Sequence, residues 1–141
     1  MGMTTSLTQI NFSKNEIEVM AENVFWGLTR LGSIYLDRNK ILNLARNVFN
    51  GLLELKYLSL SNNDIGEVNE ELFRDLSNLA MLDLHGNELI TIPVGLFNGL
   101  TSLQKVYLSN NRIISIPSPT QLGLMSHLMV IDLQENNMNK S

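Results

Sequence analysis

The chain has 141 residues, a formal net charge of −4, 44% hydrophobic residues and no cysteine. Its apolar runs are all shorter than the roughly 20 residues that a membrane-spanning helix needs, so we expect no direct membrane insertion. The ten basic residues are spread along the chain. A nucleic-acid partner, which would require a basic patch or stripe, is therefore not expected.

An asparagine recurs every 24 or 25 residues, each time inside a copy of the pattern L-x-x-L-x-L-x-x-N-x-L. The copies begin near residues 7, 31, 55, 79, 103 and 128, and the last copy is incomplete. A fixed period of this size is typical of a solenoid, in which each unit buries its apolar side only against its neighbours. We therefore predict a single domain over residues 1–141.

The alternation at the centre of each copy predicts a short strand with its apolar residues turned inward. In chain order, these strands are expected around residues 10–12, 34–36, 58–60, 82–84, 106–108 and 131–133. Successive strands should add in parallel to one sheet. The solenoid should be right-handed, as parallel strand connections nearly always are.

Two further columns of side chains should support the stack. Behind each strand, a buried amide can satisfy backbone groups that no strand pairing reaches. This structural ladder comprises Asn15, Asn39, Asn63, Asn87, Asn111 and Asn136. On the far side, a spine of aromatic rings should stack from coil to coil. It comprises Phe25, Phe49, Phe73 and Phe97.

Over residues 7–138 this pattern resembles that of the leucine-rich repeat proteins. The 24-residue unit, with Phe49-x-x-Leu52 and Ile92-Pro93, is similar to the subclass of Toll-type receptors, Slit-like guidance proteins, variable lymphocyte receptors and hormone-receptor ectodomains. The resemblance implies an α/β fold, with a curved parallel sheet on the concave face and loops and short helical turns on the convex face. It also implies extracellular or cell-surface recognition of a protein ligand.

The absence of cysteine departs from that subclass, whose members usually close both ends with disulfide-bonded caps. We therefore expect a fragment, or an open-ended product, of a longer array. The alternative is a complete protein whose uncapped ends self-associate. Leu128, Ile131, Leu133 and Met138 form the apolar edge that would fray or find a partner.

One copy carries an extra residue, which falls within Pro117–Gln121, and Leu122 then takes the place of a spine phenylalanine. Two prolines in such a turn favour a rigid, irregular connection on the convex side. A contact site is the other interpretation.

The side chains that point outward from the concave face are free of a role in the fold, so a binding site is expected among them. They form three columns. The central column reads Asn11, Tyr35, Ser59, Asp83, Tyr107 and Asp132. The column two residues later reads Ser13, Asp37, Ser61, His85, Ser109 and Gln134. The column two residues earlier reads Gln9, Ser33, Tyr57, Met81, Lys105 and Val130.

The predicted ligand-binding cluster lies in the middle of these columns and consists of Tyr35, Tyr57, Met81, Asp83, His85, Lys105 and Tyr107. Tyrosine and methionine are typical of protein-binding patches. All three tyrosines of the chain fall here. The alternative is that these residues only suit a sheet, since tyrosine also has a high strand propensity.

A catalytic interpretation has one basis: Ser61 and Ser109 lie in the same column as His85, close to Asp83. An open sheet face has no oxyanion hole and no buried orienting carboxylate, so we predict no enzyme activity. The other histidine, His127, lies far along the chain. We therefore predict no metal site and no cofactor.

The sequence thus predicts a protein-binding module, as part of a cell-surface or secreted receptor. Zero cysteines and a start without signal-peptide features favour an intracellular, cytoplasmic adaptor as the alternative. A structural or self-assembly module is the third possibility. Asn11-Phe12-Ser13 and Asn139-Lys140-Ser141 also fit the glycosylation acceptor pattern.

Overall fold

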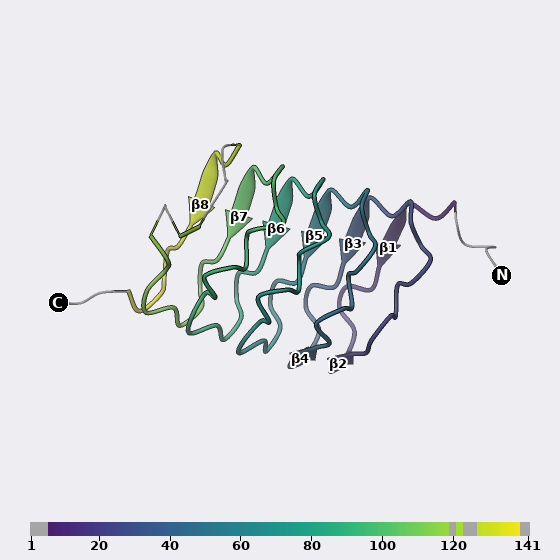
Figure 1. Ribbon diagram of the computed structural model, residues 1–141. Coiled ribbons are helices and arrows are strands. Elements are labelled where there is room, and N and C mark those ends of the chain that lie inside the picture. Colours follow the sequence, from purple (N-terminus) through teal and green to yellow (C-terminus); the bar gives the residue numbers. More distant parts are fainter. Residues whose placement is uncertain (1–5, 119–120, 123–126, 139–141) are drawn as a thin grey trace.

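The computed structural model describes residues 6–118, 121–122 and 127–138, which wind through successive coils with one strand of the main sheet in each (Figure 1). The main sheet has six strands: β1 (Gln9–Asn11), β3 (Ser33–Tyr35), β5 (Tyr57–Ser59), β6 (Met81–Asp83), β7 (Lys105–Tyr107) and β8 (Val130–Asp132). All neighbouring strands in it pair in parallel, in the order β1-β3-β5-β6-β7-β8. The prediction of a parallel-strand solenoid is confirmed.

A second, two-stranded parallel sheet lies apart from the main one. It pairs β2 (Val19–Met20) with β4 (Asn43–Leu44). An isolated bridge between Thr91 and Ser115 joins two later coils. The repeat pattern did not predict this small sheet.

The core runs along the inside of the stack, because the central residue of each strand points inward. Ile34, Leu58, Leu82 and Val106 are fully buried at successive coils. On the far side, the ring centroids of Phe25 and Phe49 lie 6.1 Å apart and those of Phe49 and Phe73 6.2 Å apart, both pairs stacked. Phe97 is also buried, and Leu122 is buried at the next coil.

The short helical turns expected on the convex side are not confirmed, since the described residues contain no helix. In the second coil, the amides of Val48, Asn50 and Leu52 each bond the carbonyl three residues back, at 3.0, 3.1 and 3.3 Å. These bonds start at every second residue. Because a 3₁₀ helix needs such bonds at consecutive residues, the segment remains a chain of separate turns.

The asparagine side chains join each coil to the one before it. The Asn63 Nδ2 group donates to Leu60 O within its own coil at 3.1 Å and to Leu36 O of the preceding coil at 3.0 Å. Its Oδ1 accepts from Ile41 N at 2.9 Å. The same pattern recurs at Asn39, Asn87, Asn111 and Asn136. Asn15, in the first coil, is exposed, and its Nδ2 donates to Phe12 O and Ser13 O of its own coil.

The residue before each ladder asparagine has a left-handed backbone conformation. These residues are Lys14, Arg38, Asn62, Gly86, Asn110 and Glu135, with φ between 55° and 73°. The left-handed turn redirects the chain at the end of the strand, so that the following asparagine side chain can reach inward. L-residues other than Asn and Asp adopt this conformation at a cost.

The irregular connection Pro117–Gln121 lies partly outside the described residues, at 119–120. At its described ends, Ser118 N donates to Gln121 Oε1 at 3.0 Å and Gln121 N donates to Ser118 Oγ at 3.3 Å. This reciprocal pair has the form of a capping box.

Core positions become accessible in the two terminal coils. Phe12 is 41% exposed and Ile131 is 36% exposed, although the matching residues of the inner coils are fully buried. Among the residues that the structure describes, no helix is long and apolar enough to cross a membrane.

Candidate functional site

The outward surface of the six-stranded sheet, here called the sheet face, carries all seven residues of the predicted ligand-binding cluster. Each of their side chains is half-buried: Tyr35, Tyr57, Met81, Asp83, His85, Lys105 and Tyr107. They come from the strands β3, β5, β6 and β7 and from the residues that follow β6. The strand register aligns Met81 with Lys105 and Asp83 with Tyr107.

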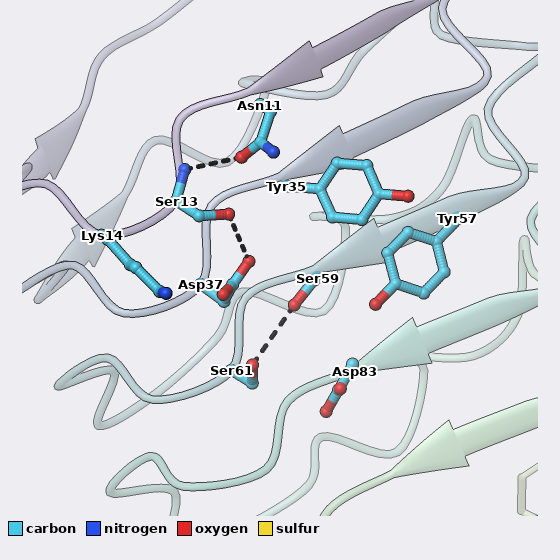
Figure 2. Close-up of a pocket in the computed structure, with 9 residues that line it drawn as sticks. All are labelled: Asn11, Ser13, Lys14, Tyr35, Asp37, Tyr57, Ser59, Ser61 and Asp83. Atoms are coloured by element: carbon cyan, nitrogen blue, oxygen red, sulfur yellow. Dashed lines mark hydrogen bonds between the residues drawn. The ribbon is translucent and has the colours of Figure 1, made fainter.

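A hollow in the sheet face lies toward its N-terminal side (Figure 2). This sheet hollow has a volume of about 690 Å³ and is lined by Asn11, Ser13, Lys14, Tyr35, Asp37, Tyr57, Ser59, Ser61 and Asp83. Three residues of the predicted cluster therefore line it, and four do not. Its volume falls in the range of ligand pockets in proteins.

Two small side chains create the hollow. Ser59 and Ser61 are 3% and 5% exposed, and their hydroxyl oxygens lie 3.3 Å apart. In the register of the sheet, Ser59 lies between Tyr35 and Asp83, which are both larger. The surface is therefore lower at the third coil than at the second and fourth coils in this column.

Two tyrosine rings border the hollow. The ring centroids of Tyr35 and Tyr57 lie 5.1 Å apart, with planes tilted by 43°. Burial raises the pKa of the Tyr57 hydroxyl, the Ser59 hydroxyl lowers it, and the nearby Asp83, Tyr35 and Asp37 raise it further. The two carboxylates thus exert a negative potential on the ring that faces them.

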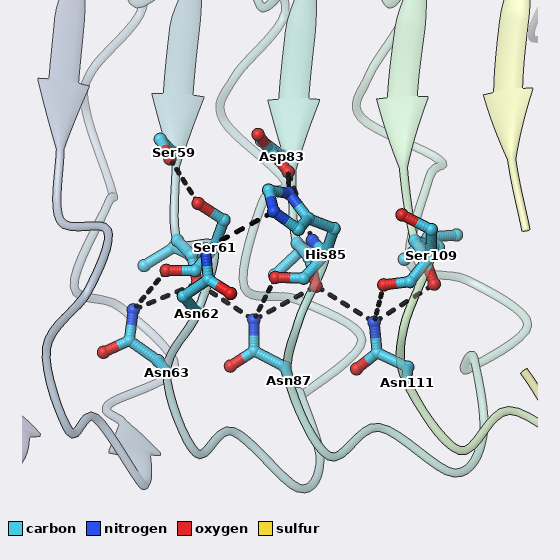
Figure 3. Close-up of polar contacts among 12 residues, drawn as sticks. Ser59, Ser61, Asn62, Asn63, Asp83, His85, Asn87, Ser109 and Asn111 are labelled. Carbon is cyan, nitrogen blue, oxygen red and sulfur yellow. Dashed lines mark hydrogen bonds and ion pairs between the residues drawn. The ribbon is translucent and has the colours of Figure 1, made fainter. Parts of the chain in front are cut away.

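The carboxylates on the sheet face are held by neighbouring donors. Ser13 Oγ donates to Asp37 Oδ1 at 2.7 Å. Asp83 Oδ1 lies 2.7 Å from His85 Nδ1 and accepts from His85 N at 3.1 Å. Figure 3 shows this pair above the asparagine ladder, with Asn62 on the other side of the imidazole.

The Ser, His and Asp side chains considered for catalysis are only partly brought together. His85 contacts Asp83 through Nδ1, but its Nε2 lies 3.4 Å from Nδ2 of the Asn62 side chain. The Ser61 hydroxyl instead contacts Ser59. In the described ranges, no group of three or more His, Asp or Glu side chains is placed to hold a metal ion.

The columns predicted from the sequence contain Asn11, Ser13, Asp37, Ser59 and Ser61, but the predicted ligand-binding cluster does not include them. Lys14 is also absent from that cluster. The available signal was side-chain size: Ser59 and Ser61 are short where the adjacent coils carry Tyr35, Asp37, Asp83 and His85. Where two neighbouring columns both carry a small residue at one coil and larger residues at the coils on either side, a depression in the surface is predicted.

Comparisons with known proteins agree with this architecture. Two family models described as leucine rich repeat match residues 29–89 and 102–123. A search of curated protein sequences found no match.

Among solved structures, a leucine-rich repeat protein of Leptospira interrogans matches 97% of this chain with 26% identity and a TM-score of 0.84. The leucine-rich repeat domain of APL1B matches 92% of it, also with 26% identity and a TM-score of 0.84. The matches cover 33% and 38% of those two chains, so this chain spans about a third of their length. The chain belongs to the leucine-rich repeat proteins.

Proposed function

We propose that this chain is a recognition module that binds a protein partner through its sheet face. Leucine-rich repeat domains generally mediate protein–protein interaction. The observation that carries the proposal is that Tyr35, Tyr57, Met81 and Tyr107 are half-buried on one face. Their accessible parts offer a partner both apolar area and hydroxyl groups.

The chemistry of these side chains suits a partner of irregular shape. Tyrosine combines a rigid apolar ring with a polar tip, and methionine adapts to the surface it meets. Binding energy in protein interfaces concentrates in a few such central anchors. We propose Tyr57, Met81 and Tyr107 as the anchors, with Asp83 and His85 adjusting specificity.

Selection from a randomised peptide library displayed on phage, with the chain as bait, tests this proposal. Each of the variants Tyr57→Ala, Met81→Ala and Tyr107→Ala should weaken the binding free energy of the selected peptides by roughly 1–3 kcal/mol. Calorimetry measures this change. The convex variants Glu71→Ala and Arg74→Ala are the controls, since both residues are exposed away from the sheet. Peptides that lose affinity only with the convex variants would contradict the proposal.

We further propose that the module belongs to a cell-surface or secreted receptor. The 24-residue unit and its Phe49-x-x-Leu52 motif support this, because they resemble the extracellular subclass. Biotinylation of intact cells that express the protein should label it or recover it from the medium. Recovery only from the cytosol would favour the adaptor instead.

A further inference from the structure

Hydrogen bonds hold the two carboxylates that line the sheet hollow in place, but each carboxylate keeps one oxygen without a partner among the described residues. Asp37 uses Oδ1 to accept from Ser13, and Asp83 uses Oδ1 for both contacts with His85. Within the described part of the chain, neither Oδ2 atom has a hydrogen-bond or ion-pair partner. Each side chain therefore keeps one oxygen available to a ligand while its neighbour holds it in orientation.

These carboxylates lie on the coils on either side of the one that carries Ser59 and Ser61. Coils repeat at about 4.8 Å, so a group resting on the serines lies within reach of both carboxylates. Both serines line the sheet hollow, so a small, flat group that enters between the two carboxylates has polar atoms beneath it.

Both the aromatic rings and the formal charge of the lining favour a cationic group. The tilted rings of Tyr35 and Tyr57 border the space, and the faces of such rings attract cations. The lining carries two carboxylates and one ammonium group, that of Lys14, which gives a formal charge of −2 + 1 = −1. Lys14 is exposed and forms no ion pair with either carboxylate within the described residues.

We propose that the sheet hollow binds the guanidinium group of an arginine side chain on the partner protein, an assignment that rests on the proposed function. A guanidinium ion is planar, stacks on aromatic rings and presents its donors in a fork that fits carboxylate oxygens. Asp37 and Asp83 accept from its two sides. Tyr35 and Tyr57 contact its face and the aliphatic part of the side chain.

Titration with N-acetyl-L-arginine amide, followed by ¹H–¹⁵N spectra of the full chain, tests the proposal directly. N-acetyl-L-citrulline amide is the matched control, because it replaces the guanidinium with a neutral urea of nearly the same shape. We expect shifts of the backbone amides of Ser59, Ser61 and Asp83, and at least roughly tenfold tighter binding of the arginine compound. Equal affinity of the two, or equal affinity of N-acetyl-L-lysine amide, would overturn it.

Three charge variants show which groups are responsible. Asp37→Asn and Asp83→Asn keep the acceptor oxygen for Ser13 and His85 while removing the charge, and each should weaken arginine binding by roughly tenfold. Lys14→Gln should strengthen it about twofold to threefold by removing a competing cation. Glu67→Gln, an exposed residue away from the hollow, should change nothing.

Weaker arginine binding by Lys14→Gln would show that the hollow prefers an anion and would reject the assignment.

Failure of the guanidinium assignment can be distinguished from failure of the proposed function. If library peptides depend on Tyr57, Met81 and Tyr107 but contain no required arginine, the sheet face binds proteins and the guanidinium assignment is wrong. If peptides bind elsewhere and the arginine compound still shifts Ser59 and Ser61, the hollow stands as a separate site.

Discussion

The asparagine that follows each strand satisfies several backbone groups with one side chain. Asn63 donates to Leu36 O, Leu60 O and Ser61 O and accepts from Ile41 N. Among the described residues, Leu36 O, Leu60 O and Ile41 N have no backbone partner, whereas Ser61 O also accepts from Arg38 N at 2.9 Å. A carboxamide is suited to the position because it has both a two-proton donor and an acceptor.

We predict that Asn63→Leu destabilises the fold by roughly 1–3 kcal/mol, because it leaves buried backbone groups unpaired. Urea-induced unfolding followed by circular dichroism measures the free energy of unfolding. Asp64→Ala, at an exposed neighbour, should change it by no more than about 0.5 kcal/mol. Equal stability of the Asn63 variant and the parent would disprove this account of the ladder.

A second prediction concerns the ionisation of Tyr57, whose pKa is raised chiefly by burial. Since the folded protein favours the neutral phenol, Tyr57 contributes stability that is present below the ordinary tyrosine pKa of about 10 and is lost as pH rises through the folded pKa. In a tyrosinate absorbance titration of the folded protein, one of the three tyrosines should therefore ionise last.

Tyr57→Phe should remove that late step. It should also reduce the loss of stability in alkaline solution, measured by urea-induced unfolding at several pH values. A late step that persists in Tyr57→Phe would assign it to Tyr35 or Tyr107 instead.

The sequence alone predicts the asparagine ladder, but it does not predict how the carboxylates of the site are oriented. The amide column could be predicted because the same unpaired backbone groups recur in every coil. The orientations of Asp37 and Asp83 depend on Ser13 and His85, which are not part of the repeat. The sheet hollow depends on the sizes of side chains in three adjacent coils, and a repeat pattern contains no such information.

Among the elements, the turn at the end of each strand is the most uniform, and its left-handed residue varies freely in type. Gly86 and Asn62 suit this conformation, whereas Lys14, Arg38 and Glu135 do not. We therefore predict that Arg38→Asn stabilises the chain by about 0.5–1 kcal/mol. Differential scanning calorimetry measures the change.

Arg38→Ala is the matched control, because it removes the same exposed side chain and keeps the unfavourable conformation. Its stability should equal or fall below that of the parent. If both variants gain equally, the effect comes from the loss of charge rather than from the backbone.

The convex turns are the elements for which the expectation from the sequence is not confirmed. Their spacing of apolar residues fits one helical turn, and buried residues such as Val48, Phe49 and Leu52 do face the core. Gly51, with φ of 83°, interrupts the right-handed conformation between them. Whether successive turns fuse into a helix depends on such backbone details rather than on the apolar pattern.

For the whole molecule, stability should be graded from the centre of the stack to its ends. Inner coils bury their strand residues on both sides, whereas Phe12 and Ile131 are exposed. We predict that amides of residues 9–15 and 128–138 exchange hydrogen faster than those of residues 58–65 and 82–89. We also expect the apparent mass in light scattering to increase with concentration, as exposed ends associate.

Phe12→Ser and Ile131→Ser should reduce this association, because each removes apolar surface from an exposed edge. Uniform exchange protection together with a constant monomer mass would contradict both expectations. The matched substitution at an inner coil, Leu60→Ser, should instead lower the free energy of unfolding, since Leu60 is fully buried.

The extra residue before β8 shows that loop length and strand register are independent in this solenoid. Lys105 pairs with Val130, 25 residues later, whereas Met81 pairs with Lys105, 24 residues later. The ladder bonds of Asn136 to Leu108 O and Ile113 N are both 2.9 Å, as short as those of the regular coils. A recognition surface built on such strands can keep its geometry through insertions and deletions in the outer loops, so related chains are free to evolve new loops and a new binding surface separately.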